Sequence, residues 1–219
     1  MHTQVLIVAA PGRGPRIECV GGVAARRTAP DAVHLVSTAA TPLGGDTIDV
    51  RVVVEAGARL RLRSVAAMMV LPGATTTRSR SGWDLEVAGE LDVDPEPTVI
   101  AGGSSHEATT RLRITGDGRV RVRERVQVGR VGEQHGFWSG SLHVDRDGSP
   151  VVRHRVELGA GAVSDDEIAA PRAYVSEFRY PESDFGVIRN GQGYESRRDH
   201  VVMALADGGC LSAWQGPKL

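Results

Sequence analysis

The stretch DTIDVRVVVEAGARLRLRS, Asp46 to Ser64, carries the alternation that decides the fold. Apolar residues occupy every second position before a turn at Gly57, as Ile48, Val50, Val52 and Val54. After the turn, Leu60 and Leu62 alternate with arginines. Because successive side chains of a β-strand point to opposite faces, the stretch predicts a β-hairpin with one buried face.

The same alternation recurs along the chain. It returns from Thr109 to Arg130 around Gly116-Asp117-Gly118, from Ser141 to Gly159 around Asp147-Gly148, and from Val201 to Trp214 around Gly208-Gly209. Similar units that recur along one chain favour stacking. We therefore predict one domain over residues 1–219 with an all-β fold, a β-helical or two-layer β body of stacked hairpins with little helix.

Helical periodicity is scarce. The best candidate begins at Ser164, a possible N-cap followed by acidic residues, and Pro171 limits it to about two turns. Pro181 to Asp199 has no periodicity and predicts a long loop.

Composition excludes several classes of protein. The formal net charge is -1, which argues against a dedicated nucleic-acid binder. Cys19 and Cys210 form no C-x-x-C pattern, so a reduced, cytoplasmic setting fits best. The apolar runs are too short for a membrane span or a signal sequence, so we expect no membrane partner.

Two carboxylates fall on the buried side of predicted strands. Counting back by twos from Val54 reaches Asp46, and Glu124 shares its parity with Val122 and Val126. An inward carboxylate costs free energy unless it is paired, hydrogen-bonded or facing internal water. An arginine partner or a bulge would explain each residue. The other explanation is a polar cavity or channel through the β body.

Other chemical signals are weak. The seven histidines form no H-x-H or H-x-x-x-H pair, so no tightly bound metal is indicated. No G-x-x-x-x-G-K-[ST] phosphate loop is present, and GGSSHE at 102–107 lacks the G-x-S-x-G pattern. Six arginines between Arg111 and Arg125 could form a basic stripe on one hairpin, either balanced by acidic neighbours or facing an acidic partner.

Three motifs resemble those of a known family. They are STAATPLGGD at 37–46, DPEPTVIAGG at 94–103 and RERVQVGRVGEQHGFWSG at 123–140. Their order and separations are similar to those of the urease accessory protein UreD, in its short actinobacterial form. The family's motif positions map onto Gly44, Gly45, Asp46, Pro97, Thr98, Glu124, Gly129, Arg130, Gly132 and Glu133.

The resemblance implies a non-enzymatic accessory protein, a metallochaperone scaffold that assists nickel insertion into apo-urease. The implied partners are UreF, the GTPase UreG and the urease structural subunits. No permanent cofactor is implied, only transient nickel(II). An internal tunnel proposed for this family would give Asp46, Glu124 and Glu133 a role along a nickel passage. Longer members continue into C-terminal helices that help to engage UreF, whereas this sequence ends at Leu219.

Two other functions remain open at this stage. An all-β protein- or carbohydrate-binding module would need exposed aromatic residues near loops, and Phe137, Trp138 and Trp214 are the candidates. An enzyme using Glu96, Glu124 and a histidine as acid and base has no convergent spacing behind it.

Overall fold

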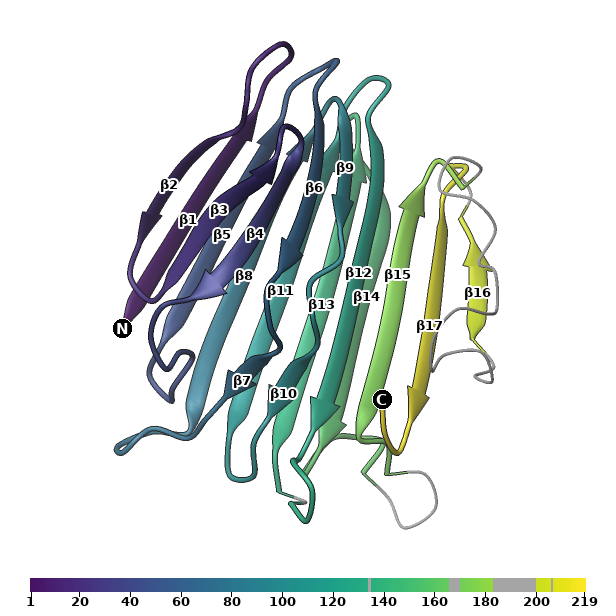
Figure 1. The fold of residues 1–219 in the computed structure, drawn as a ribbon. Coiled ribbons are helices and arrows are strands. Elements are labelled where there is room, and N and C mark those ends of the chain that lie inside the picture. The colour runs from purple at the N-terminus through teal and green to yellow at the C-terminus, as the bar shows by residue number, and fades with distance from the viewer. Residues whose placement is uncertain (134, 166–169, 183–199, 206) are drawn as a thin grey trace.

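The structure is a computed structural model, and it describes residues 1–133, 135–165, 170–182, 200–205 and 207–219. Over these residues the secondary structure consists of strands without a helix, so the all-β prediction is confirmed. The strands form two sheets, which lie one behind the other as the two layers of one body (Figure 1). The predicted helix after Ser164 and the predicted loop 181–199 lie largely outside the described residues.

The seven-stranded sheet has the order β14-β13-β11-β8-β5-β1-β2. Its central pairs, from β1 to β13, are parallel, and its two outer pairs are antiparallel. The strands are β1 (His2–Ala9), β2 (Arg16–Val20), β5 (Thr47–Val54), β8 (Arg78–Val87), β11 (Ser105–Ile114), β13 (Phe137–Arg146) and β14 (Ser149–Gly159).

The ten-stranded sheet has the order β16-β17-β15-β12-β9-β6-β4-β3, with β7 and β10 joined to it through β12. The pairs from β4 to β12 are parallel, and those at either end are antiparallel. The strands are β3 (Val23–Ala29), β4 (Ala32–Ser37), β6 (Arg59–Ser64), β7 (Met68–Val70), β9 (Glu90–Val93), β10 (Thr98–Ile100), β12 (Arg119–Val128), β15 (Ala173–Tyr180), β16 (Val201–Ala204) and β17 (Cys210–Gly216).

Two of the predicted hairpins are wrong. β5 and β6 lie in different sheets, as do β11 and β12, so each turn is an arch that carries the chain from one layer to the other. Successive arches stack, because the Ala88 amide donates to the Val54 carbonyl and the Thr115 amide donates to the Val87 carbonyl. An arch and a hairpin both bury one face of each strand, so alternation alone cannot distinguish them.

The other two hairpins are confirmed. β13 and β14 pair antiparallel across Asp147-Gly148, where both residues have positive φ, 46° and 83°. This matches a type I′ turn, whose twist fits two directly paired strands. β16 and β17 also pair antiparallel, at the far end of the ten-stranded sheet.

The core lies between the sheets and has two separate parts. The larger cluster, which includes Val52, Leu60 and Leu112, lies toward the arches at the top of Figure 1. The smaller one, which includes Ile100, Val128 and Trp138, lies toward the opposite end of the body. A less apolar level between them contains the candidate site.

The ten-stranded sheet is interrupted at this level. β6 ends at Ser64 before β7 begins at Met68, and β9 ends at Val93 before β10 begins at Thr98. Pro95 and Pro97 lie in the second gap, where proline lacks the amide that a sheet ladder needs. Pro97 immediately precedes β10.

Candidate functional site

A row of small side chains creates a cavity between the sheets. Ser81, Ala108 and Gly140 are direct neighbours on three adjacent strands, β8, β11 and β13. The row two inward positions nearer the arches consists of the larger residues Leu85, Leu112 and Val144, which are buried. The missing side-chain volume leaves a cavity of about 220 Å³, which we call the chamber.

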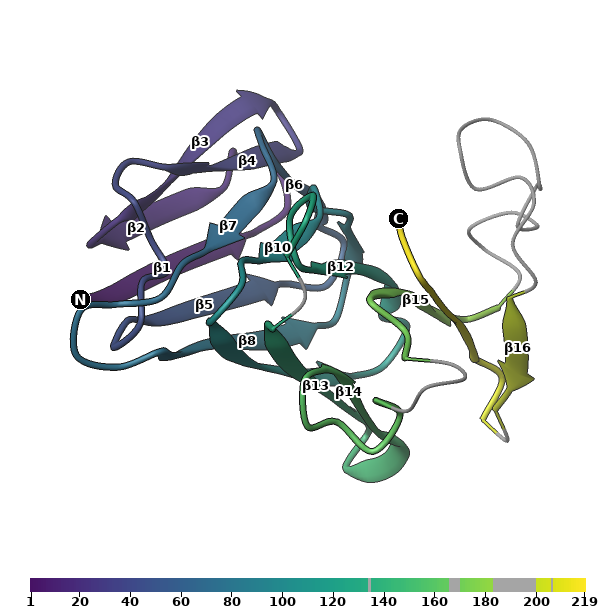
Figure 2. The same cartoon turned by 90° about the horizontal axis from the view of Figure 1, so that it is seen from below.

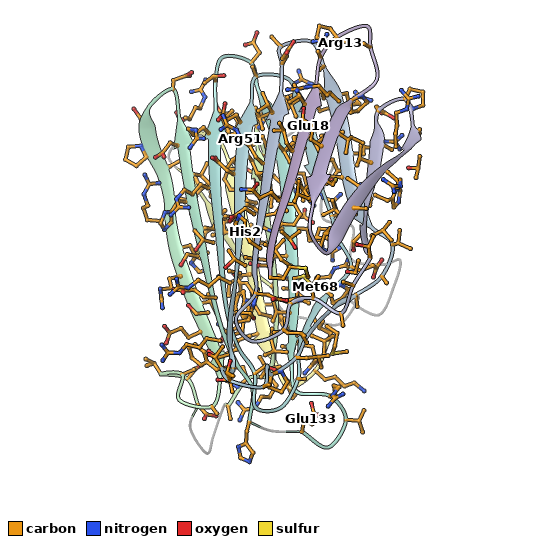
Figure 3. All side chains as sticks on the ribbon, turned by 90° about the vertical axis from the view of Figure 1, so that its left-hand side faces the viewer. His2, Arg13, Glu18, Arg51, Met68 and Glu133 are labelled. Atoms are coloured by element: carbon orange, nitrogen blue, oxygen red, sulfur yellow. The ribbon has the colours of Figure 1, made fainter. Side chains whose placement is uncertain are left out.

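The chamber reaches the protein surface at the interruption of the ten-stranded sheet. Its lining includes the exposed residues Val65, Ala66, Ala67 and Glu96, which belong to the two irregular segments there. Met68 also lines the chamber, and Figure 3 shows it partway along the body. The two gaps in the strands therefore form a mouth for the chamber.

Glu124 lies at the centre of the polar level. Its side chain lines both the chamber and a second cavity of about 20 Å³ on its other side. The carboxyl group points inward, as the alternation in β12 predicted. Burial raises its pKa to about 7, because a carboxylate is poorly solvated among protein atoms.

His106 is a buried polar group of the chamber that the sequence did not single out. Its Nδ1 lies 2.8 Å from Ser79 Oγ and its Nε2 lies 2.9 Å from Ser81 Oγ. Only 1% of the residue is exposed, and burial lowers its pKa to about 4. The ring is therefore neutral at pH 7, and one nitrogen accepts a hydrogen bond while the other donates one. The sequence could have indicated its burial, because His106 lies on the same face of β11 as Ala108 and Leu112.

A second polar pair lies beyond Glu124. His154 Nε2 and the Tyr174 hydroxyl are 3.1 Å apart, and both residues line the small cavity together with Glu124 and Ser176. Burial raises the pKa of Tyr174 and lowers that of His154, so both are neutral at pH 7. Polar groups thus extend from Ser81 across Glu124 to the edge strand β14.

Asp46 is buried but does not line the chamber. It is 6% exposed, and it accepts hydrogen bonds from Thr41 Oγ1 and the Leu43 amide, both at 2.9 Å, and from the Met1 amino group. Burial alone would raise its pKa, but these bonds outweigh burial and hold the pKa below its ordinary value. Asp46 therefore stabilises the turn that enters β5.

The two glycines before Asp46 have separate structural reasons. Gly45 has a φ of 93°, in the left-handed region that favours glycine. A Cβ on Gly44 would lie 1.7 Å from the Thr76 carbonyl oxygen, so only glycine allows the two segments to approach.

Glu133 lies in the loop between β12 and β13, at the lower end of the body (Figure 3). It accepts hydrogen bonds from the Gly102 amide at 2.8 Å, the Arg130 amide at 3.0 Å and Arg130 Nε at 2.8 Å. The Arg130 guanidinium and these amides lower its pKa to about 2. Asp46, Glu124 and Glu133 thus occupy three different surroundings, and only Glu124 lines the chamber.

The remaining motif residues shape the backbone near the chamber and its lower end. The Pro97 carbonyl accepts a hydrogen bond from the Met68 amide, and Thr98 lines the chamber. Gly129 and Gly132 have positive φ of 81° and 83°, which curves the loop that carries Glu133.

The predicted single arginine stripe is wrong. Arg111 and Arg113 belong to the seven-stranded sheet, whereas the arginines from Arg119 to Arg125 belong to the ten-stranded sheet, because the connecting turn is an arch. Arg113 pairs with Asp84 and Glu86, and Arg121 pairs with Asp92, Asp94 and Glu177. Acidic neighbours therefore balance both groups.

The described residues set limits on metal and membrane chemistry. They contain no group of three or more His, Cys, Asp or Glu side chains that could hold a metal ion. They also contain no helix long and apolar enough to cross a bilayer.

The fold and the site together define a class. The protein is a two-layer, solenoid-like β scaffold with an internal chamber between two hydrophobic core clusters. The chamber has a mouth on one side and a mainly apolar lining that includes Glu124 and His106.

The comparison with known proteins identifies the family. Residues 23–178 match the model of the UreD urease accessory protein, so the chain belongs to the UreD family. Urease accessory protein UreD 1 of Saccharopolyspora erythraea is 37% identical over 195 residues, which are 87% of this chain and 74% of that protein.

Two further relatives match a shorter part of the chain. The urease accessory protein UreD of Frankia alni is 47% identical over 115 residues, and that of a Parafrankia species is 43% identical over 120 residues. These alignments cover 52% and 54% of this chain but only 39% and 40% of the two relatives, so the matched part spans less than half of either protein.

Proposed function

We propose that this protein is a non-enzymatic scaffold that assists nickel insertion into apo-urease, together with UreF and the GTPase UreG, in the cytoplasm. Membership of the UreD family supports the link to urease. The single observation that carries the mechanism is the chamber, with Glu124 at its centre and a mouth between two interrupted strands.

The oxygen and nitrogen atoms that line the chamber could act as ligands for a cation that passes through it. Nickel(II) accepts oxygen and nitrogen ligands, and Glu124, His106 and the serine hydroxyls supply both kinds. These donors are spread along the chamber rather than gathered, so each would hold nickel weakly. Weak, spaced contacts allow a cation to leave again, as a passage requires.

In this proposal the passage runs between the two cavities. The chamber opens at Val65–Ala67 and at Pro95 and Glu96, and the small cavity beyond Glu124 is lined by His154 of β14. Nickel would enter or leave at the mouth and meet Glu124, which lines both cavities. Asp46 and Glu133 act in this proposal through the backbone that surrounds the passage rather than by contact with the ion.

The Ser79–His106–Ser81 group is the nearest approach to a catalytic arrangement. Its serines are 3% and 6% exposed, and the pKa of His106, about 4, makes the ring a poor general base at pH 7. This supports the non-enzymatic function. The carbohydrate-binding alternative loses its best anchor, because Trp138 is only 1% exposed.

The experiment that tests the proposal removes the central carboxylate without changing its shape. Glu124→Gln, co-expressed with UreF, UreG and the urease subunits, is expected to give a complex in normal yield but urease with at least a tenfold lower nickel content. The readouts are complex recovery by size exclusion and nickel per urease active site by elemental analysis.

The matched control is Asp49→Asn, which removes a half-exposed carboxylate from the outer face of β5. It is expected to leave both yield and nickel content unchanged. Wild-type nickel content with Glu124→Gln would exclude Glu124 from the passage, whereas loss of the complex would assign Glu124 to assembly.

A further inference from the structure

The walls of the chamber are mainly apolar. Aliphatic side chains from both sheets, such as Leu35, Val50 and Leu85, make up much of the lining. These side chains offer no ligand atoms to a metal ion, which binds through oxygen, nitrogen or sulfur. Apolar walls with a few polar groups are typical of a pocket that holds an organic molecule.

Two tryptophans, Trp83 and Trp138, also line the chamber. They belong to β8 and β13 of one layer, whereas Glu124 belongs to β12 of the other layer, as the view from below shows (Figure 2). An indole ring packs against apolar groups and attracts a cation to its face. The tryptophans therefore favour a ligand that combines an apolar body with a positive charge.

Glu124 supplies the opposite charge for such a ligand. Among the described residues it forms no hydrogen bond and no ion pair, and burial alone accounts for its raised pKa. Arg123 and Arg125 also line the chamber, but their guanidinium groups pair with Asp94. A buried carboxylate without a partner costs free energy, so a cation that enters the chamber is stabilised beside it.

The volume of the chamber limits the size of the ligand. It measures about 220 Å³, whereas a protein cavity of about 150 Å³ holds a benzene molecule. The chamber therefore has room for one aromatic ring with a short substituent. The mouth at Val65–Ala67 gives such a molecule access from the surface.

We propose that the chamber is a binding site for a small organic ammonium ion, a primary amine of about the size of benzylamine. Its ammonium group donates hydrogen bonds to the Glu124 carboxylate, and its apolar part lies against Trp83, Trp138 and the aliphatic walls. This binding goes beyond nickel insertion and does not depend on it. An amine that occupies the chamber would compete with any metal ion that enters.

Isothermal titration calorimetry of the full chain at pH 8, without metal, tests the proposal. The Glu124 carboxyl is mainly ionised at this pH. The two probes are benzylammonium and benzyl alcohol, which have nearly the same shape but differ in charge. The wild type is expected to bind benzylammonium at least tenfold more tightly than benzyl alcohol, because only the cation pairs with Glu124. Equal affinity for the two probes, or no binding of benzylammonium, would overturn the proposal.

Two variants and a control locate the site. Glu124→Gln should remove the preference for the cation and still bind benzyl alcohol. Ala108→Leu places a larger side chain in the chamber, so it should weaken the binding of both probes at least tenfold. Asp49→Asn is the matched control, because it removes an exposed carboxylate from β5, and it should bind both probes like the wild type.

Circular dichroism and the thermal midpoint of each variant establish that it is folded. A folded Glu124→Gln protein that keeps the preference, or a folded Ala108→Leu protein that binds normally, would place the amine outside the chamber and overturn the proposal. No measurement here contains nickel or a partner protein. Failure of amine binding can therefore be distinguished from failure of nickel insertion.

Discussion

Two levels of the seven-stranded sheet, on either side of the row Trp83, Thr110 and Leu142, differ in the size and polarity of their inward side chains. Nearer the arches, the row Leu85, Leu112 and Val144 fills the space between the sheets. Beyond the intervening row, the small residues Ser81, Ala108 and Gly140 leave the chamber open. The register of β8, β11 and β13 is continuous across both levels, whereas the ten-stranded sheet is interrupted beside the chamber. Small inward side chains on one sheet and strand gaps in the other therefore together create the level that is available for function.

Gly140 shows why a small residue is required in the chamber row. A Cβ at this position would lie 2.1 Å from the Trp138 ring, because the indole folds over the glycine. Trp138 thereby belongs to the lower core cluster and also lines the chamber. The small residue therefore lets one large side chain close the lower boundary of the chamber.

The largest expected effect comes from making the packed level resemble the chamber level. Leu112→Ala removes a fully buried side chain and is expected to lower the free energy of unfolding by about 2–5 kcal/mol. Urea denaturation at pH 7 measures this loss. A loss below about 1 kcal/mol would show that this level is also loosely packed, which would remove the contrast.

The next effect concerns the pH dependence of stability, which the chamber level controls through two opposed groups. The pKa of Glu124 rises on folding from 4.5 to about 7, so folded protein binds more protons and its stability falls as pH rises through that range. The pKa of His106 falls from 6.5 to about 4, so its contribution to stability rises with pH through nearly the same range.

In the wild type these two contributions to the pH dependence of stability are expected to cancel between pH 4.5 and 6.5. In a variant that lacks one of the two groups, the contribution of the other remains. Glu124→Gln should make stability rise with pH, and His106→Asn should make it fall, each by up to about 3 kcal/mol. Water in the chamber would reduce the slope of the free energy of unfolding against pH in both variants, because it would solvate the charged forms of Glu124 and His106. Urea denaturation across this pH range measures them, and equal slopes in both variants would contradict the assignment.

The smallest expected effect comes from filling the chamber. Ala108→Leu adds volume where space exists, so we expect a change of within about 1 kcal/mol in the free energy of unfolding, whereas overpacking a dense core costs about 1–3 kcal/mol. The same variant should sharply reduce nickel loading of co-expressed urease. Val144→Leu in the packed row is the control, since it should lower stability and spare loading.

Much of the fold could be read from alternation. The buried face of each strand, the turn positions and the inward direction of Glu124 follow from a period of two, because it decides which side of a strand each residue occupies. The turn at Asp147-Gly148 was a hairpin because its residues favour the left-handed φ values that a type I′ turn requires.

The arches could not be predicted in the same way. The segments around Gly57 and Gly116 connect strands that face each other through side chains, and the partners that pair with their backbones lie elsewhere in sequence, such as β8 beside β5. The chamber was equally hidden, because it requires Ser81, Ala108 and Gly140 to become neighbours across three strands.

The amino-acid sequence by itself determined that this chain is an all-β protein of the UreD family type, with an inward carboxylate at Glu124, since both inferences depend on local alternation and on motifs. The tertiary structure decided that Asp46 and Glu133 support turns and loops while Glu124 meets His106 and Tyr174 around the cavities. The physical reason is that strand pairing between distant segments sets which side chains meet, and no local pattern records that pairing.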